Sequence, residues 1–331
     1  MKYNKKQLPR GFVTEQKQAE HARVLSDSVR KKYNHLRRRY AKEGIDCFRL
    51  YDWDSPDIRV VVDWYAGHIV VGEYERIQTG AGYLDAMAAA VSSALGVCTG
   101  NVHIKRRHTV TSDGDRYSRL SYDNKRFVVN ERDIKLYVDL DDFLDTGLYS
   151  DHRNTRRMIR AEVRGKDFLN LFAYTGVVTL AAIKGGAKTT ATVDRNKTYI
   201  DWAKENLALN DMSPEGNEFI ALDTFDFLKH TAQSGRKYSY IFVDPPSFFK
   251  DEEKGVSFDV NKDHVHLLTE VIKCAACDAD IIFSTNHQRF EPRFGGLRVR
   301  SINELTPATV PEDYRNKKIH RCWRLKPLRD Q

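Results

Sequence analysis

Short apolar runs alternate with longer segments of helical spacing through the second half of this 331-residue chain. Runs of this length between helical segments are typical of buried parallel strands joined by crossover helices. Strands are expected at 168–174, 188–194, 217–222, 239–244 and 279–284, helices near 176–184, 196–210, 224–232 and 261–276, and a closing hairpin at 297–304 and 320–325. The pattern predicts an α/β fold with a mostly parallel sheet of seven strands. Its ligand site is expected at the carboxyl ends of the strands.

The first predicted strand ends in a turn of small and aromatic residues, and the second ends in a carboxylate. Residues 168–176 read Phe-Leu-Asn-Leu-Phe-Ala-Tyr-Thr-Gly, and Asp194 closes the next strand. An acid at this place can accept hydrogen bonds from both hydroxyls of a ribose. A dinucleotide fold would show two or three closely spaced glycines, whereas this turn has only Gly176. A nucleoside cofactor without phosphate therefore fits better.

The fourth predicted strand runs directly into Asp244-Pro245-Pro246-Ser247-Phe248, which we call the ledge. Because proline lacks an N–H and fixes φ, two in a row make a rigid, non-helical segment whose carbonyls are free to accept hydrogen bonds. A planar ring can stack on Phe248 while Asp244 and the carbonyls hold its edge. The alternative interpretation is a purely structural turn.

The part of the chain before the alternating pattern is predicted to form a separate, smaller domain. Residues 1–13 resemble a loose basic tail, and 14–144 a small α+β domain, which leaves 145–331 for the second domain. In the α+β domain we expect a long helix over 14–43 that ends at Gly44, a further helix at 80–96, and strands at 47–51, 58–65, 68–74, 102–107, 127–131 and 134–140.

The positive charge is concentrated at the N-terminal end. Residues 1–50 carry 14 Lys and Arg against 5 Asp and Glu, whereas the remainder carries 40 against 41. A basic field of this kind suits a polyanion such as nucleic acid. Basic residues of the first helix either form a solvated face or contact phosphates, and the regional charge favours the second. The candidate RNA-binding residues are Arg30, Lys31, Lys32, Arg37, Arg38 and Arg39, with Lys105, Arg106 and Arg107 on a later strand.

The five cysteines are scattered and odd in number, which indicates reduced thiols in a cytosolic compartment. Cys274-Ala-Ala-Cys277 has metal-like spacing, but no second Cys or His pair completes four ligands. We expect this segment to pack inside a helix, and we predict no metal. No window approaches the apolar run of about 20 residues that spans a membrane, and no apolar signal core follows the N-terminus. The prediction is a cytoplasmic protein without a membrane partner.

The turn at 168–176 with Asp194 resembles the class I S-adenosylmethionine-dependent methyltransferases. The Asp-Pro-Pro-aromatic pattern is similar to the fourth motif of nucleic-acid nitrogen methyltransferases, and residues 221–227 resemble their adenine-contacting segment. A longer ordered set resembles the guanine-N7 methyltransferase half of the bacterial bifunctional large-subunit ribosomal RNA methyltransferase K/L. It comprises Asp145-Thr146-Gly147-Leu148, Asp151-His152-Arg153, residues 170–176, Asp244-Pro245-Pro246, Phe258-Asp259-Val260, Asp263-His264, Ile319-His320 and Cys322-Trp323. His35-Leu36-Arg37-Arg38, Tyr51-Asp52, Pro56-Asp57 and Val62-Asp63 match the domain before it.

This resemblance implies a class I methyltransferase fold, S-adenosylmethionine as cofactor, and methylation of guanosine N7 in 23S rRNA or a large-subunit assembly intermediate. It implies a cofactor site lined by Tyr149, Asp151, Arg153, Asn170, Phe172, Tyr174, Thr175, Gly176, Asp194, Arg195, Asp223 and Thr224. It implies a catalytic role for Asp244, Pro245, Pro246 and Phe248. Residues 145–157 join the two domains, and from pattern alone Tyr149, Asp151 and Arg153 would lie in a surface loop. Ser247 stands where the family is expected to have Thr. The guanine-N2 half is absent from this sequence, so a separate guanine-N2 methyltransferase is a candidate partner.

Three other functions stay open at this point. Related enzymes methylate C5 of cytosine, which usually requires a cysteine thiolate. We expect no cysteine at a strand tip near Asp244, although Cys322 follows a late edge strand. Methylation of an exocyclic amine would also be served by the ledge. A non-catalytic RNA-binding or assembly factor could retain the same fold.

Overall fold

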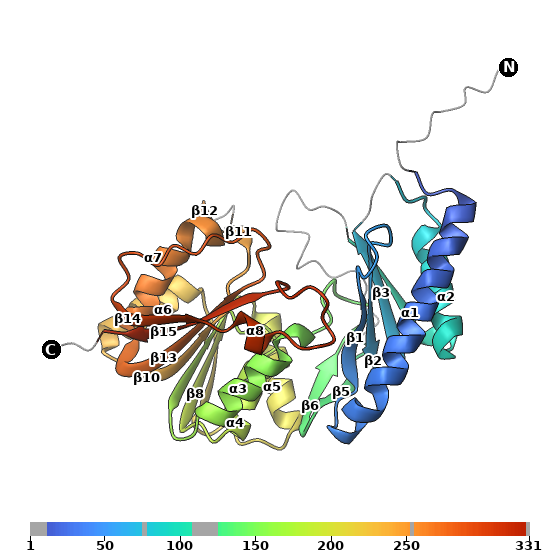
Figure 1. The fold of residues 1–331 in the computed structure, drawn as a ribbon. Coiled ribbons are helices and arrows are strands. Elements are labelled where there is room, and N and C mark those ends of the chain that lie inside the picture. Colours follow the sequence, from blue (N-terminus) through green and yellow to red (C-terminus); the bar gives the residue numbers. More distant parts are fainter. Residues whose placement is uncertain (1–11, 75–77, 108–124, 252–254, 329–331) are drawn as a thin grey trace. The chain divides into compact units, whose positions relative to one another are not determined.

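The computed structural model describes residues 12–74, 78–107, 125–251 and 255–328, and it divides the chain into two compact units (Figure 1). The first unit consists of the described part of Met1–Thr111, Lys125 and Leu140–Leu144. The second contains Arg126–Asp139 and Asp145–Gln331. Most of the predicted basic tail, residues 1–11, lies outside the described residues.

In the first unit two helices pack on a four-stranded sheet. The elements are α1 (Glu15–Lys42), β1 (Cys47–Asp52), β2 (Val60–Tyr65), β3 (His68–Tyr74), α2 (Tyr83–Leu95), the short 3₁₀ helix η1 (Thr99–Asn101) and β4 (Val102–Arg107). The sheet order is β1-β2-β3-β4, with β4 parallel to β3. The hydroxyl of Thr14 caps α1, and Leu25, Val29 and Leu36 form its buried stripe. The elements predicted up to residue 107 are confirmed within a few residues.

Two acids of the matched segments have a structural role in this unit. The Arg49 guanidinium donates from Nε to Asp63 Oδ1 at 2.8 Å and from Nη1 to Asp52 Oδ1 at 3.0 Å. The pair with Asp63 links β1 to β2, whereas the pair with Asp52 lies within β1, and the Arg49 side chain is mostly buried. The presence of these two acids is therefore explained by the ion pairs that they form within the sheet.

The second unit is built on the predicted seven-stranded sheet. Its strands are β7 (Asp167–Leu171), β8 (Thr189–Asp194), β9 (Asn217–Ala221), β10 (Tyr238–Val243), β13 (Ala275–Thr285), β14 (Val299–Glu304) and β15 (Arg321–Pro327). They lie in the order β14-β15-β13-β10-β7-β8-β9, and only β15 runs antiparallel to its neighbours. The mostly parallel sheet with a late hairpin is confirmed.

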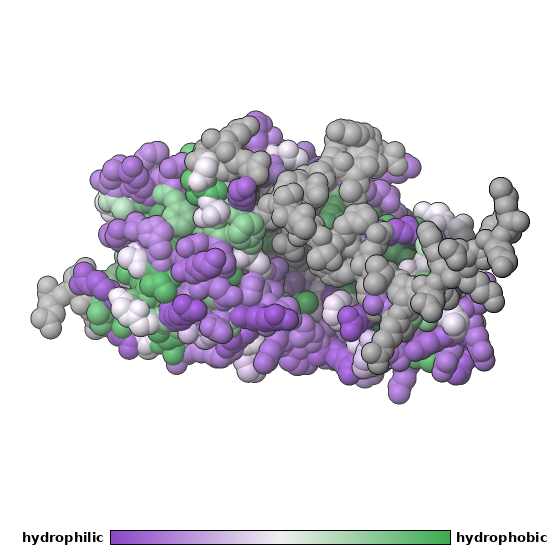
Figure 2. All heavy atoms as spheres, turned by 90° about the horizontal axis from the view of Figure 1, so that it is seen from above, coloured by the Kyte–Doolittle hydropathy of each residue, from purple (hydrophilic) through white to green (hydrophobic). Residues whose placement is uncertain are grey.

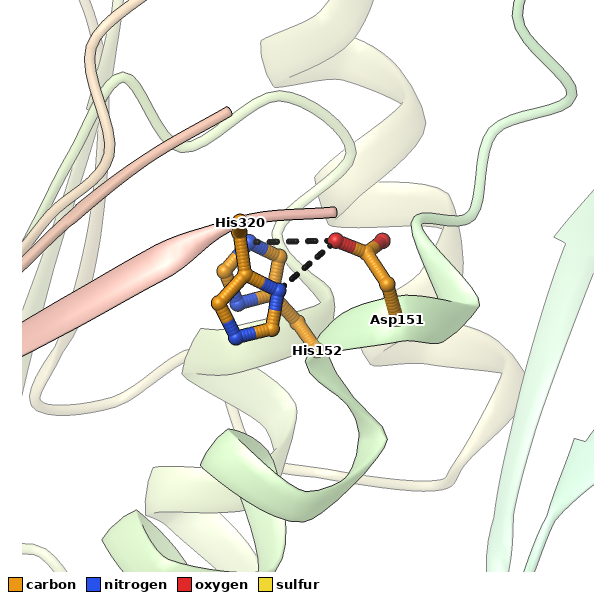
Figure 3. Close-up of side chains that lie close together, drawn as sticks. All are labelled: Asp151, His152 and His320. Atoms are coloured by element: carbon orange, nitrogen blue, oxygen red, sulfur yellow. Dashed lines mark hydrogen bonds and ion pairs between the residues drawn. The ribbon is translucent and has the colours of Figure 1, made fainter. Parts of the chain in front are cut away.

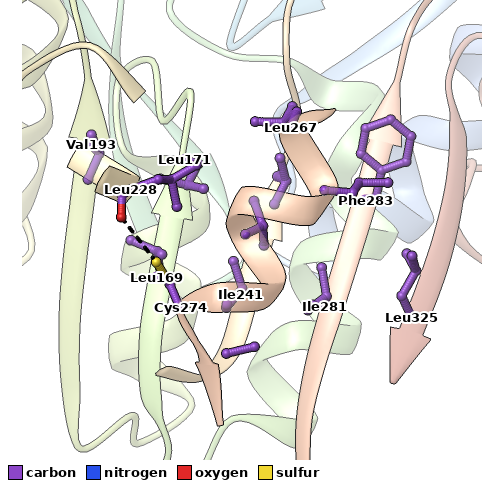
Figure 4. Close-up of a cluster of buried hydrophobic side chains, with 14 of the residues drawn as sticks. Leu169, Leu171, Val193, Leu228, Ile241, Leu267, Cys274, Ile281, Phe283 and Leu325 are labelled. Carbon is purple, nitrogen blue, oxygen red and sulfur yellow. Dashed lines mark hydrogen bonds between the residues drawn. The ribbon is translucent and has the colours of Figure 1, made fainter. Parts of the chain in front are cut away.

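Helices cover both faces of this sheet. The larger core packs α6 (Thr224–Ser234) and α7 (Val260–Lys273) against side chains such as Leu169, Ile241 and Phe283 (Figure 4). On the opposite face, α3 (Arg153–Glu162) and α4 (Val177–Lys184) pack on Phe168 and Phe242. The helix α5 (Lys197–Leu209) lies beside α4 and β8, and the one-turn α8 (Thr306–Thr309) packs against α3 and β15. The parallel strands therefore read as continuous apolar runs because they are buried on both faces.

A hairpin predicted for the first domain belongs to the second unit. It consists of β5 (Phe127–Glu131) and β6 (Ile134–Val138). Side chains of α5 replace a neighbouring strand: Asn206 Oδ1 accepts from Tyr137 N at 2.9 Å, and Asn210 Oδ1 accepts from Lys135 N at 2.8 Å. The division into units therefore does not coincide with the predicted boundary after residue 144.

Two local expectations were wrong, and one hairpin was not predicted. Arg153 does not lie in a surface loop but begins helix α3, because Ile159 anchors the helix and the charges of Arg153 and Arg156 are buried against carboxylates. Cys274 and Cys277 do not share a helix, since α7 ends at Lys273 and β13 begins at Ala275. The ledge leads into an unpredicted hairpin of β11 (Phe248–Asp251) and β12 (Val256–Asp259).

Candidate functional site

The turn after β7 is strained and held from several sides. Phe172, Tyr174 and Gly176 all have left-handed backbone angles, with φ of 56°, 50° and 72°. This conformation costs a residue other than glycine about 1–2 kcal/mol, and such strain persists where the surroundings enforce it. The Thr175 hydroxyl donates to the Gly147 carbonyl at 2.6 Å, and Gly147 N donates to the Tyr174 hydroxyl at 2.9 Å. The segment before α3 therefore fixes the turn.

Gly176 is required by close packing as well as by its backbone angle. A Cβ at this position would lie 2.7 Å from Ala203 Cβ on α5. The absence of a side chain lets the N-terminus of α4 approach α5, directly beside the carboxyl edge of the sheet.

Asp194 lies at the end of β8, next to this turn. Its Oδ2 accepts from Tyr174 N at 2.9 Å and its Oδ1 from Asn196 N at 2.8 Å. Burial raises the pKa of Asp194, and the two backbone donors and Arg195 act in the opposite direction. Each carboxylate oxygen retains a further lone pair, so both hydroxyls of a ribose can still bind. The exposed Arg195 places its guanidinium over the Phe249 ring, 4.9 Å from the centroid.

The third strand contributes Asp223 and Thr224. Asp223 Oδ1 accepts from Phe225 N at 2.9 Å and so caps the N-terminus of α6. Thr224 is buried, so it shapes this corner without being exposed to a ligand. The predicted contact of Asp223 with an adenine amine would use lone pairs that the cap leaves free.

Asp194 and Asp244 lie on the same edge of the sheet. Asp194 is the last residue of β8 and Asp244 follows β10, and these two strands are the direct neighbours of β7. Neighbouring strands are about 4.8 Å apart, so the two strand ends are separated by roughly 10 Å. The strand order changes direction between β7 and β10, and ligands of open α/β sheets bind at such a point. The carboxylates and the strained turn between them suit a nucleoside with a polar tail.

The ledge is held in place on three sides. Asp244 Oδ2 lies 3.3 Å from His152 Nε2, and the Asp244 side chain keeps 23% of its surface exposed. Ser247 Oγ donates to Asn286 Oδ1 at 2.7 Å, and Val260 N donates to the Ser247 carbonyl at 3.1 Å. Phe248 is 44% exposed. The ledge therefore carries both a solvent-exposed aromatic ring and a partly exposed carboxylate.

Three predicted cofactor contacts have other partners in the structure. Arg153 is only 2% exposed and donates to both oxygens of Asp313, at 3.1 and 3.0 Å. Asn170 is 1% exposed, and its Nδ2 donates to Thr179 Oγ1 at 3.0 Å. Asp151 is also buried, against His320. These side chains stabilise the walls of the site, whereas Phe172, Tyr174 and the exposed Tyr149 remain accessible at the edge.

Asp151, His152 and His320 form a buried group whose ligand atoms lie close enough to hold a metal ion (Figure 3). The two imidazole rings are stacked, with centroids 4.2 Å apart and planes inclined by 11°. The ring lone pairs lie in the ring planes, so the nitrogens of two parallel stacked rings cannot point at one ion. The geometry is that of a hydrogen-bonded array. Both histidines lie within the matched motif segments, but nothing in the sequence indicated a role for either of them.

The predicted RNA-binding residues fall into two groups. Those on α1 are exposed, apart from the half-buried Lys32. On β4, Lys105 is 4% exposed and its Nζ donates to the Phe143 carbonyl at 2.5 Å, so the prediction for this residue is wrong. Arg106 is exposed but pairs with Asp85 at 2.6 Å, and the side chain of Arg107 lies outside the described residues.

None of the cysteines of the second unit presents an exposed thiol at the edge that carries Asp244. Cys47, Cys274 and Cys322 are buried, and Cys98 belongs to the first unit. Cys277 is exposed near the start of β13, at the opposite edge of the sheet. Burial raises the pKa of the Cys322 thiol, and the nearby Asp244 carboxylate raises it further. The second unit itself therefore places no exposed cysteine for C5 methylation beside Asp244.

Seen from above, the described surface is mostly hydrophilic, with smaller hydrophobic areas between (Figure 2). Among the helices of the described residues, none is both long and apolar enough to cross a membrane.

Comparison with known proteins identifies the family. Residues 51–295 match the family described as S-adenosylmethionine-dependent methyltransferase. The structure resembles that of SMU.776 complexed with SAH, with a TM-score of 0.74 at 23% identity over 92% of this chain and 81% of the other. It also resembles the M. jannaschii tRNA m1G37 methyltransferase, with a TM-score of 0.53 at 14% identity over 87% of this chain and 78% of the other. At these identities the likeness concerns the fold.

Two curated relatives are similar over nearly the whole chain. The ribosomal RNA large subunit methyltransferase K of Neisseria meningitidis is 34% identical over 91% of this chain and 86% of its own length. The ribosomal RNA large subunit methyltransferase K/L of Vibrio cholerae is 38% identical over 90% of this chain, which spans only 43% of that relative. The chain belongs to the family of S-adenosylmethionine-dependent methyltransferases, and S-adenosylmethionine is its methyl donor.

Proposed function

We propose that this enzyme methylates N7 of a guanosine in large-subunit ribosomal RNA, as free 23S rRNA or in an assembly intermediate. The observation that carries the proposal is the placement of Asp194 and Asp244 on one sheet edge, either side of the strained turn, with Phe248 exposed beside them. The names of relatives at 34% and 38% identity support the ribosomal RNA substrate. The N7 position rests on the resemblance of the matched motifs.

The cofactor end of the site is formed by the turn, Asp194 and the corner at Asp223. When bound, S-adenosylmethionine supplies an electrophilic methyl group on a positively charged sulfur. Asp194 would accept from the ribose hydroxyls with the lone pairs that its backbone donors leave free. The left-handed residues Phe172 and Tyr174 give the backbone the bend that brings this turn beside the carboxylate.

The base end of the site is formed by the ledge. N7 of guanine has an in-plane lone pair and no proton, so its methylation requires no general base. Catalysis then depends on orienting the purine, and alignment of this kind accounts for a large part of a rate enhancement. Phe248 offers a face on which the ring stacks, and Asp244 offsets the positive charge that develops on the purine. In folded RNA the base would be extruded to reach the ledge.

The exposed basic residues of α1 supply a candidate phosphate-binding surface. Five of the six predicted positions are exposed. Arg30 and Arg39 lie 3.6 and 3.7 Å from Asp27 and Glu43, and such surface pairs contribute little and exchange easily for phosphate. Release of counterions from RNA would make binding strongly dependent on salt.

Nucleoside mass spectrometry of ribosomal RNA, from cells with and without the gene, tests the proposal. Loss of 7-methylguanosine, restored by the wild-type gene and not by Asp244→Ala, is the expected result. Loss of 5-methylcytidine or of an N-methylated exocyclic amine would replace the proposal by one of the rival methylations. An unchanged nucleoside profile would refute it and favour a non-catalytic RNA-binding factor.

A second experiment uses purified enzyme, methyl-labelled S-adenosylmethionine and ribosomal RNA as free RNA or as large-subunit particles. Transfer of label identifies which form is the substrate. Replacing Arg37, Arg38 and Arg39 together by Glu should weaken RNA binding and lower its salt dependence, with cofactor binding unchanged. The separate guanine-N2 methyltransferase proposed as a partner would be sought by co-purification with this chain.

A further inference from the structure

Two segments far apart in the sequence meet behind the ledge. Asp151 Oδ2 lies 2.9 Å from His320 Nδ1, across 169 positions of sequence. Next to this contact the Arg153 guanidinium binds both oxygens of Asp313, and both side chains are buried. The start of α3 is thereby joined to the segment that leads into β15.

The contacts continue from His320 to the carboxylate of the ledge. His320 Nε2 lies 3.0 Å from Thr309 Oγ1, and the His320 ring stacks on that of His152. His152 Nδ1 lies 3.3 Å from Thr155 Oγ1, and its Nε2 lies 3.3 Å from Asp244 Oδ2. Every ring nitrogen of the two histidines thus has a polar neighbour. Figure 3 shows the two rings overlapping face to face, with Asp151 next to both.

We propose that His152 is a positioning residue for methyl transfer, which holds one carboxylate oxygen of Asp244 and leaves the other to meet the base. The inference rests on the proposed function in one respect, namely that Asp244 faces the substrate. His152 is buried, whereas Asp244 is partly exposed, so His152 contacts Asp244 from the protein interior and the exposed part of Asp244 can face a ligand.

The charged groups around His152 determine which histidine carries a proton. Burial lowers the pKa of His152, but the carboxylates of Asp244 and then Asp151 outweigh burial and the repulsion from Arg156, so its pKa is raised. For His320, burial and the neighbouring His152 lower the pKa, although Asp151 and Asp244 act in the opposite direction. His152 therefore takes up a proton at a higher pH than His320 does. Two stacked imidazolium ions would repel each other.

This charge affects what the ledge can bind. An imidazolium donates to Oδ2 of the Asp244 carboxylate and leaves the second oxygen to accept hydrogen bonds from the base. The Watson–Crick edge of guanine offers an N1–H and an amine to such an acceptor, and N7 lies on the other side of the ring. As the pH rises through the raised pKa of His152, the ring loses its positive charge, and its hydrogen bond to Asp244 is no longer charge-assisted. Because N7 needs no base, methyl transfer should then become slower.

Histidine NMR tests the contact without any substrate. In enzyme labelled with ¹⁵N-histidine, the His152 signals are those that disappear in His152→Gln. They should remain imidazolium above pH ~6.5, the ordinary histidine value, and Asp244→Asn should lower the titration midpoint by about one unit or more, as expected when a close carboxylate is removed. His103, which contacts His68 at 3.1 Å and Asp141 at 2.7 Å in the first unit, is the matched control and should not move. A midpoint below the ordinary value, or one unchanged in Asp244→Asn, would overturn the proposal.

Kinetics test the consequence. The single-turnover rate of the wild-type enzyme should fall as the pH rises on the alkaline side. His152→Gln should be slower by about tenfold or more, which is the effect of losing a charge-assisted hydrogen bond. Its rate should not change with pH on the alkaline side, and its affinity for the cofactor should be that of the wild type. His68→Gln should keep the wild-type profile. A wild-type profile in His152→Gln would refute the positioning role. If the wild-type enzyme methylates no guanosine, the proposed function fails while the NMR result still decides the contact.

Discussion

Replacing Asp194 by asparagine tests the cofactor end of the site. Both carboxylate oxygens accept a backbone N–H, from Tyr174 at 2.9 Å and Asn196 at 2.8 Å. Asparagine keeps one acceptor oxygen, but its NH₂ group faces a backbone N–H donor. That end of the side chain can no longer accept a hydrogen bond from the turn or from a ribose hydroxyl. A hydrogen bond to a charged group contributes about 1.5–3 kcal/mol. The affinity for S-adenosylmethionine should therefore fall by roughly 10- to 150-fold, at 1.4 kcal/mol for each factor of ten.

Isothermal titration with S-adenosylmethionine measures this loss. Asp201→Asn is the matched control, because it removes the same charge on α5, where Asp201 pairs with the exposed Lys197. The control should bind like the wild-type enzyme, and Asp194→Ala should bind more weakly than Asp194→Asn. If Asp194→Asn bound as tightly as the control, with the same thermal unfolding temperature, the role given to Asp194 would be refuted.

The same site predicts a pH dependence. Burial raises the pKa of Asp194, so its carboxylate takes up a proton at a higher pH than an exposed aspartate does. A ligand that donates hydrogen bonds prefers the ionised form, and its affinity should therefore decrease as the pH falls through this pKa. Titrations over a pH series should show the decrease in the wild-type enzyme and its absence in Asp194→Asn.

Three further predictions concern stability and chemistry. Gly176→Ala should lower the free energy of unfolding, measured in urea, by at least the ~1–2 kcal/mol cost of a left-handed residue, because its Cβ also meets Ala203 at 2.7 Å. Glu131→Gln leaves Arg156 buried without its charge partner and should cost about 3–5 kcal/mol. Burial raises the pKa of Glu131, but Arg156 outweighs burial, so the pKa is lowered in the folded protein. The pair therefore stabilises the wild type at pH values above the unfolded pKa, and this stability is lost as the pH falls through the lowered folded pKa. The free energy of unfolding of Glu131→Gln should lack this pH dependence. Cys322→Ser should retain methyl transfer, and loss of activity in a folded variant would indicate a thiol nucleophile.

The sheet could be predicted from the sequence because its strands are buried on both faces. Burial of this kind leaves uninterrupted apolar runs such as Tyr240–Val243, and the crossover rule then fixes which strand ends meet. The positions of Asp194 and Asp244 on one edge follow from chain order alone. Of the candidate site, these two acids, the turn at Tyr174 and the ledge required no further information.

The remainder could not be predicted, because it depends on pairs that are distant in sequence. Nothing local distinguishes Arg153, whose charge is buried against Asp313, from the exposed Arg157 four residues later. Likewise, the basic run at 105–107 predicts an RNA surface, although the ammonium of Lys105 is directed inward to a loop carbonyl 38 residues away. Periodicity records which face of an element is apolar, and it does not record which charges are paired inside the fold.

The proposed reaction requires rigid positioning of both reactants, and both ends of the site are rigidly held. Attack by N7 needs no proton acceptor, so the enzyme can contribute mainly by restricting the two reactants. At the cofactor end, Asp194 is fixed by two backbone donors at the tip of a strained turn. At the base end, prolines stiffen the ledge, and His152 contacts the carboxylate of Asp244 from the buried side. A titrating group in that position cannot reach the substrate, and its proton therefore serves to orient Asp244.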